Sequence, residues 1–153
     1  MSSVSLIAPP VRYSCVTKGI YRGSYPLERN VDFLKGLRLK TIVTIAPDPL
    51  APLDGLENVE YIHIESAAEQ SKSKKKRGLP ISSETVKQAL DIIQDPERQP
   101  VYVHCLNGAQ VTCLVIGCYR RTKCWSLNSV LAEFGRYTDY DRVESQFIET
   151  LFT

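Results

Sequence analysis

The sequence predicts an α/β fold in which a small central sheet is flanked by helices. Short apolar, β-branched segments alternate with segments of helical periodicity, and only helical patterns follow residue 112. A chain of 153 residues, 43% of them apolar, is long enough to bury one core, so we expect a single domain over residues 11–153. Residues 1–10 end in two prolines and are expected to form a loosely held arm.

The expected strands are short. Residues Val11–Arg22 mix apolar, β-branched and aromatic types around Gly19, which is typical of two strands joined by a turn. Thr41–Ile45 is a β-branched apolar run of the kind found in buried central strands. Tyr61–Ile64 and Val101–Val103 have the same character and complete the predicted sheet.

Five segments are expected to be helical. Asn30 is the expected cap of the first, and Ser82 or Ser83 is the expected cap of the second, because their side-chain oxygens can accept hydrogen bonds from first-turn amides. The expected helices are Val31–Leu37, the segment from Ser83 to just before Pro96, Thr112–Tyr119, Trp125–Tyr137 and Tyr140–Phe152.

Composition indicates where in the cell the protein is expected and which ligands it is not expected to bind. A net charge of +2 gives no basis for nucleic-acid binding, and no apolar run approaches the roughly 18 residues of a membrane span. The stretch Val4–Ala8 is too short for a secretory signal, so we expect a cytoplasmic protein, or a nuclear one. Five cysteines without CxxC spacing, and only two histidines, favour reduced thiols over a zinc site.

The segment from Val101 to Thr112 carries the chemistry of this sequence. It reads VYVHCLNGAQVT, an apolar strand that runs through His104 into Cys105 and then into a short loop and a helix. Such a turn presents backbone amides and a helix N-terminus to one point, which makes an anion site. The same field should lower the pKa of the Cys105 thiol and make it a nucleophile.

This segment resembles the HCxxGxxR(S/T) signature of protein tyrosine phosphatases. His104, Cys105, Gly108 and Thr112 match it at the required spacing. The resemblance implies that Cys105 is the nucleophile, that His104 orients the loop and lowers the thiol pKa, and that Thr112 stabilises the thiolate. It also implies that the backbone of Leu106, Asn107, Gly108, Ala109, Gln110 and Val111 binds phosphate, with no metal or organic cofactor.

Val111 departs from the signature. In the family this position holds an arginine whose planar guanidinium grips two phosphate oxygens and stabilises the transition state. Valine has neither charge nor donor, and the other residues of the loop are uncharged as well. Losing one preorganised donor commonly costs about 100- to 1000-fold in rate, so the sequence predicts weakened or absent turnover.

Further segments resemble the plant-and-fungi atypical dual-specificity phosphatases, including a fungal branch linked to oxidant-induced cell-cycle arrest. These segments are GIYRGSYP (19–26), FLKGLRLKTIV (33–43), QPVYVHC (99–105), CYRRTKCWSLNSVLAEF (118–134) and RVESQFIE (142–149). The resemblance therefore implies a three-layer, dual-specificity phosphatase-like fold for nearly the whole chain. Active members of that group are phosphatases, and some act on inositol pyrophosphates.

The general acid of such a reaction is not fixed by spacing. Phosphatases of this class protonate the leaving group with a carboxylic acid from a nearby loop, usually an aspartate. The only aspartate between residues 60 and 92 is Asp91, which falls inside a predicted helix. Glu65, Glu69 and Glu84 remain as candidates.

A cationic run precedes the helix that begins near Ser83. Residues 72–77 carry five positive charges, including Lys74, Lys75, Lys76 and Arg77, and no apolar anchor, so we expect a solvated loop. The resemblance implies that this loop lies beside the phosphate loop, where these cations could contact a bound anion in place of the missing arginine. A localisation patch or a polyanion tether is the other interpretation.

Three hypotheses follow from the sequence. The first is a pseudophosphatase, or a severely weakened phosphatase, whose Cys105 loop binds a phosphorylated protein or an inositol phosphate. The second is an active phosphatase on phosphotyrosine or inositol (pyro)phosphates that takes its cation from the lysine-rich loop. The third is a structural subunit in a complex of related phosphatase-like proteins.

Overall fold

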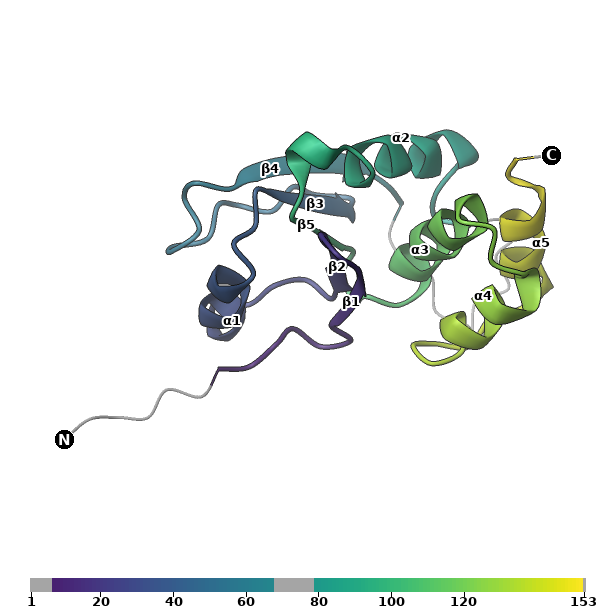
Figure 1. The fold of residues 1–153 in the computed structure, drawn as a ribbon, viewed down its shortest axis with the longest axis horizontal. Coiled ribbons are helices and arrows are strands. Elements are labelled where there is room, and N and C mark those ends of the chain that lie inside the picture. Colours follow the sequence, from purple (N-terminus) through teal and green to yellow (C-terminus); the bar gives the residue numbers. More distant parts are fainter. Residues whose placement is uncertain (1–6, 68–78, 153) are drawn as a thin grey trace.

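A computed structural model describes residues 7–67 and 79–152 of the chain, and it contains one five-stranded sheet between helices (Figure 1). The strands are β1 (Ser14–Thr17), β2 (Ile20–Gly23), β3 (Thr41–Ala46), β4 (Glu60–Glu65) and β5 (Val101–His104). The helices are α1 (Val31–Gly36), α2 (Ser83–Ile93), α3 (Gln110–Thr122), α4 (Leu127–Phe134) and α5 (Arg142–Thr150), with short 3-10 turns η1 (Glu28–Asn30) and η2 (Pro96–Arg98). Within the described ranges, no helix has both the length and the apolar character needed to cross a membrane.

The strand order β1-β2-β5-β3-β4 places β5 in the middle of the sheet. Strands β2, β5, β3 and β4 are parallel, and only β1 runs antiparallel to its neighbour β2. Every residue of β3 is buried, as its unbroken apolar run predicts. Because parallel strands end at one edge, the loops after β5, β3 and β4 all leave the sheet on the same side.

Two apolar cores fill the two faces of the sheet. Helices α2 to α5 cover one face, where Val43 and Val103 pack against residues of α2 and α3. Helix α1 lies on the other face, where Leu34 packs with Ile42 and Tyr102. The predicted α/β fold with a small central sheet is therefore confirmed, and its layers are helix, sheet and helix.

The expected strands and helices are present, with shifted ends at the carboxyl-terminal helices. Ser82 caps α2 as one of the two candidates, because its hydroxyl accepts the Thr85 amide at 3.1 Å. Asn30 occupies the cap position of α1 but makes no side-chain cap there. Its amide group instead accepts from the Leu27 backbone and donates to the Ala8 carbonyl, so the expectation of an Asn30 cap was wrong.

Residues 1–6 of the expected arm lie outside the described part of the chain. The following residues contact the domain: the Asn30 side chain donates to the Ala8 carbonyl at 3.1 Å, and Pro10 is buried. The Pro10 carbonyl then accepts the Tyr13 amide at 3.1 Å, which closes a turn directly before β1.

Packing at the end of β2 predicts that Gly23 tolerates no side chain. A Cβ atom there would meet the Tyr102 hydroxyl, and that hydroxyl donates to the Ser24 carbonyl at 2.6 Å. We expect Gly23→Ala to lower the free energy of unfolding by about 2 kcal/mol, because overpacking must displace a buried ring. Urea denaturation measures it.

The matched control is Gly36→Ala, because a Cβ atom at Gly36 meets nothing within 4 Å. Gly36→Ala should leave stability unchanged or raise it by up to about 1 kcal/mol. Equal stabilities of the two variants would show that the Tyr102 ring adapts without cost.

Candidate active site

The strand β5 delivers Cys105 to the middle of the carboxyl edge of the sheet. Val101 to Val103 are fully buried, so the strand position is fixed by packing on both faces. Residues 105–111, here named the Cys105 loop, lead from His104 into α3 and include the first two residues of that helix (Figure 1). The arrangement is a strand, a loop and a helix N-terminus, which orients amide groups toward one point as the sequence predicts.

A threonine hydroxyl contacts the sulfur of Cys105. Thr112 Oγ1 donates to Cys105 Sγ at 2.9 Å, and both residues are fully buried. A hydroxyl donor at this distance stabilises negative charge on sulfur more than it stabilises the neutral thiol. This geometry supports the roles that the resemblance implies for Cys105 and Thr112, which remain predictions.

Gly108 sets the path of the loop. Its φ angle of +72° is in the left-handed region, which glycine adopts at little cost. A Cβ atom on Gly108 would lie 2.8 Å from the carbonyl carbon of Gly23 and from the Ser24 amide nitrogen. The loop therefore rests directly on the backbone that follows β2, and only glycine permits that approach.

The ring of His104 is buried and holds a defined tautomer. Nδ1 lies 3.0 Å from the Cys105 carbonyl oxygen, which can only accept, so Nδ1 carries the proton. In the neutral ring Nε2 then accepts from Thr44 Oγ1 at 2.8 Å. Burial lowers the pKa of His104 to about 4, so a neutral imidazole orients the loop and adds no positive charge beside the sulfur.

No residue of the Cys105 loop carries a cation, and the side chain of Val111 is apolar. Val111 is fully buried and belongs to the apolar core beneath the helices. The neighbouring Gln110 turns toward α5, where its Nε2 donates to Glu144 Oε2 at 3.1 Å. The amide nitrogen of Ala109 is engaged as well, because it donates to Asn107 Oδ1 at 2.9 Å.

Sequence reasoning missed two arginines near the loop. Arg22 is 1% exposed, donates to Cys113 Sγ at 3.0 Å and stacks on the Tyr137 ring at 3.7 Å. Arg12 donates from Nη1 to the Asn107 carbonyl at 3.1 Å. Arg22 could have been found as the one charged residue in the apolar run of β2, whereas nothing near Arg12 in the sequence indicates its contact with a segment 95 residues away.

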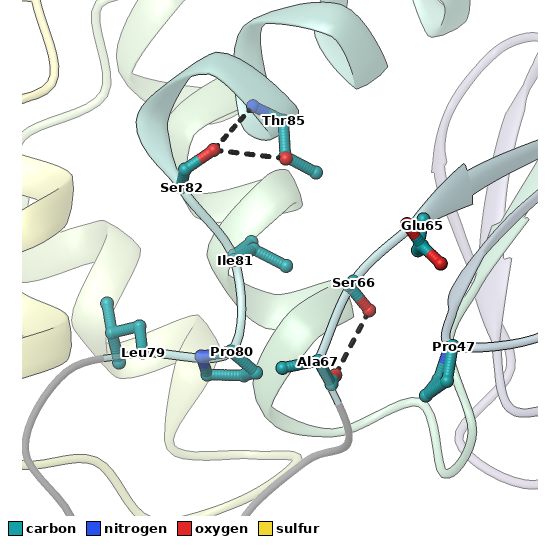
Figure 2. Close-up of a pocket in the computed structure, with 9 residues that line it drawn as sticks. All are labelled: Pro47, Glu65, Ser66, Ala67, Leu79, Pro80, Ile81, Ser82 and Thr85. Carbon is teal, nitrogen blue, oxygen red and sulfur yellow. Dashed lines mark hydrogen bonds between the residues drawn. The ribbon is translucent and has the colours of Figure 1, made fainter.

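The candidate carboxylates and cations are only partly described. Glu65 ends β4 at the carboxyl edge of the sheet, where it lines an open cavity of about 550 Å³ with Ser66 and Ser82 (Figure 2). Glu84 is exposed in the first turn of α2 and is not among the residues that line this cavity. Glu69 and residues 74–77, the remaining candidates, lie outside the described residues.

The other cysteines differ in their surroundings. Cys113 and Cys118 are buried behind the loop, as expected, whereas Cys15 and Cys124 are exposed. Burial raises the pKa of Cys118 to about 12, so this thiol is inert at neutral pH.

Comparison with known proteins agrees with this geometry. A family model described as "Tyrosine phosphatase family" matches residues 7–153. The chain belongs to the tyrosine phosphatase family. The fold and the resemblance to the plant-and-fungi group predicted from the sequence are thereby confirmed at the level of the family.

Three similar proteins illustrate the breadth of this phosphatase family. "Putative tyrosine-protein phosphatase OCA6" of Saccharomyces cerevisiae is 35% identical over 94% of this chain and 70% of its own length. "Inositol diphosphatase DSP3" of Arabidopsis thaliana is 34% identical over 84% of this chain and 63% of its own length. The solved core catalytic domain of the PP-IP phosphatase SIW14 from S. cerevisiae, in complex with citrate, is 29% identical, has a TM-score of 0.80, and matches 95% of this chain and 88% of that one.

The buried His104 ring predicts a pH dependence of stability. The folded state keeps the ring neutral down to about pH 4, whereas an unfolded histidine is protonated near pH 6.5. Stability that is fully present above pH 6.5 is therefore lost as the pH falls toward 4. Between pH 7 and 4 we expect the wild-type protein to lose about 3 kcal/mol more than His104→Gln in the free energy of unfolding.

Urea titrations at several pH values measure this difference. His63→Gln, which removes the chain's other and partly exposed histidine, is the matched control for the loss of one imidazole. The same slope in His104→Gln and the wild-type protein would contradict the assignment of the neutral ring.

Proposed function

We propose that this member of the tyrosine phosphatase family recognises phosphorylated ligands through the Cys105 loop and turns them over slowly or not at all. One observation carries the proposal. The nucleophile keeps its hydroxyl donor, at 2.9 Å between Thr112 Oγ1 and Cys105 Sγ, while the neutral Val111 side chain is buried in the core. Binding of a phosphate does not require a cation at position 111, whereas rapid turnover depends on one.

Binding in the ground state needs donors, and the loop has them. Backbone amides at a strand–loop–helix turn bind a phosphate oxygen without any charged side chain. The transition state of phosphoryl transfer spreads negative charge over equatorial oxygens, and its stabilisation depends on cations placed against them. By the resemblance, position 111 holds that cation in active relatives, and in this chain it holds an uncharged valine.

The contact of Asn107 with Ala109 also favours slow turnover. Asn107 Oδ1 accepts the Ala109 amide at 2.9 Å and lies 3.9 Å from Cys105 Sγ. This side-chain oxygen therefore takes a donor of the loop and lies near the sulfur. A phosphate that enters must displace it, which weakens binding and disfavours a close approach to the nucleophile.

The ligand class we infer is a polyphosphorylated small molecule, such as an inositol phosphate, or a phosphorylated protein. Relatives named as inositol diphosphatases support the first of these. The second candidate function is an active phosphatase, and the Thr112 contact with Cys105 favours it, because a dead enzyme has no need of a stabilised thiolate. In that case a cation from outside the loop completes the site.

Titration calorimetry tests recognition. We expect inorganic phosphate to bind with a Kd in about the millimolar range, equivalent to about −4 kcal/mol, and inositol hexakisphosphate to bind more tightly. Cys105→Ser should retain binding, since the amides remain. Gly108→Ala should lose it, because its φ of +72° and its contact with Gly23 exclude a side chain.

A lack of heat with phosphate, inositol hexakisphosphate and a phosphotyrosine peptide would overturn the proposal. Proteins that co-purify equally with the wild type, Cys105→Ser and Gly108→Ala would then favour the structural-subunit hypothesis.

Val111→Arg tests the missing cation. We expect the substitution to raise hydrolysis of p-nitrophenyl phosphate at least about 100-fold over a slow wild-type rate, because it restores a preorganised donor. Val111→Arg combined with Cys105→Ser is the matched control, since it has the same packing and no nucleophile, and it should be inactive. Circular dichroism checks that a buried arginine has not unfolded the variant.

Two results would decide against slow turnover. Wild-type turnover that already equals that of Val111→Arg, and that disappears in Cys105→Ser, would establish the active phosphatase instead. A folded Val111→Arg variant without activity would place the defect elsewhere, in the acid or in the loop geometry.

A further inference from the structure

We propose that Arg12 is a positioning residue of the Cys105 loop: its guanidinium holds the Asn107 carbonyl outward, so that the Gly108 amide points into the anion site. The inference rests on the proposed function, since it concerns how the loop binds phosphate. It assigns to the turn before β1 a role that the sequence signature around Cys105 does not contain.

The guanidinium of Arg12 bridges two segments that are distant in sequence. Nη1 donates to the Asn107 carbonyl at 3.1 Å, and Nε donates to the Tyr137 carbonyl at 3.1 Å. A guanidinium is planar and rigid, so two bonds of this kind fix its position. The side chain is exposed, and the charge therefore remains on the protein surface beside the loop.

The peptide between Asn107 and Gly108 transmits this contact. In a planar trans peptide the C=O and N–H groups point in opposite directions. A carbonyl held by Arg12 therefore directs the Gly108 amide away from the guanidinium. The preceding peptide is held in the same manner, because the Tyr25 amide donates to the Leu106 carbonyl at 3.4 Å. Each of the two successive amides, those of Asn107 and Gly108, is thus directed away from the donor that holds the carbonyl of its own peptide.

The turn that presents Arg12 is attached to the backbone on which the loop rests. The Tyr13 amide donates to the Pro10 carbonyl at 3.1 Å, and the Ser24 amide donates to the Val11 carbonyl at 2.9 Å. Gly108 packs on the same Gly23–Ser24 backbone. The turn that carries Arg12, the end of β2 and the Cys105 loop therefore contact one another directly through their backbones.

The backbone of Arg12 has a conformation in which glycine is the favoured residue. Its φ angle is +59°, in the left-handed region that glycine favours and that arginine adopts at a cost. Strain of this kind persists where surrounding contacts require it, and it concentrates at functional sites. The surrounding contacts here are the turn closed between Pro10 and Tyr13, whose third position favours a positive φ, and the bonds of the guanidinium to the two carbonyls. The loop that the guanidinium reaches contains no cation of its own.

Charge adds to orientation. A hydrogen bond from a cation to a carbonyl is stronger than one between neutral groups. It polarises the peptide, and the amide on the other side becomes a better donor. Arg12 thus gives the loop, through one peptide, part of the electrostatic support that a loop arginine would give by direct contact.

Arg12→Gly and Arg38→Gly form a matched pair for the test. Arg38 is also exposed, with a φ of +55°. It precedes β3 and therefore lies at the amino ends of the parallel strands, away from the Cys105 loop at their carboxyl ends. Both substitutions remove one charge and relieve the same backbone strain. We expect Arg12→Gly to bind inorganic phosphate about tenfold more weakly than the wild type, and Arg38→Gly to bind it equally well. Calorimetry at one salt concentration measures both.

Rescue separates positioning from general stability. Guanidinium ion at low millimolar concentration should restore part of the phosphate affinity of Arg12→Gly and should leave that of the wild type unchanged. Arg12→Lys, which keeps the charge but loses the fork, should bind with intermediate affinity. Equal urea midpoints for Arg12→Gly and Arg38→Gly would exclude a difference in folding as the cause.

The failures of the two proposals are distinguishable. If the wild type binds phosphate and Arg12→Gly binds it as well as Arg38→Gly does, the role of Arg12 is overturned and the proposed function stands. If the wild type binds no phosphate, the proposed function fails, and the NMR shifts of the Gly108 amide and the Asn107 carbonyl decide on Arg12. Shifts that are unchanged in Arg12→Gly would overturn the positioning role, and shifts that move while those in Arg38→Gly do not would support it.

Discussion

The close approach of the Cys105 loop to the end of β2 is the constraint on which the site depends. Gly108 packs against the Gly23–Ser24 backbone at 2.8 Å, a separation that leaves no room for a side chain. Because β2 and β5 are hydrogen-bonded neighbours, this contact fixes the loop relative to the sheet from which it emerges. The contact therefore holds the Cys105 loop beside the end of β2, at the carboxyl edge of the sheet.

The side chains of the Cys105 loop and the ring of His104 carry no positive charge. The His104 ring is neutral because it is buried, and position 111 contributes to the apolar core. Among the described residues, two arginines lie near the loop but outside it: Arg22 contacts Cys113 of α3, and Arg12 contacts the Asn107 carbonyl from the surface. Under the proposed function such a site binds an anion through dipoles and distant charge, which suits recognition better than stabilisation of a transition state.

Membership of the tyrosine phosphatase family relates this distribution of charge to a known reaction. The family's reaction needs a thiolate, an amide cradle, a cation and an acid, and each can be lost separately. In the described structure Cys105 has a threonine hydroxyl donor, and Glu65 lines the cavity at the sheet edge. Some of the relatives are named as inositol diphosphatases.

The sequence by itself determined the strands, the helices and the place of Cys105. Apolar periodicity and turn residues are local, so Thr41–Ile45 could be assigned to a buried strand before its neighbours were known. Only the tertiary structure decided which distant groups meet. The turn at Arg12 lies 95 residues from the carbonyl it contacts, and the side chain of Asn30 bonds to Ala8 instead of capping its helix. These contacts depend on how distant segments pack around the two faces of the sheet, and no local sequence pattern encodes that packing.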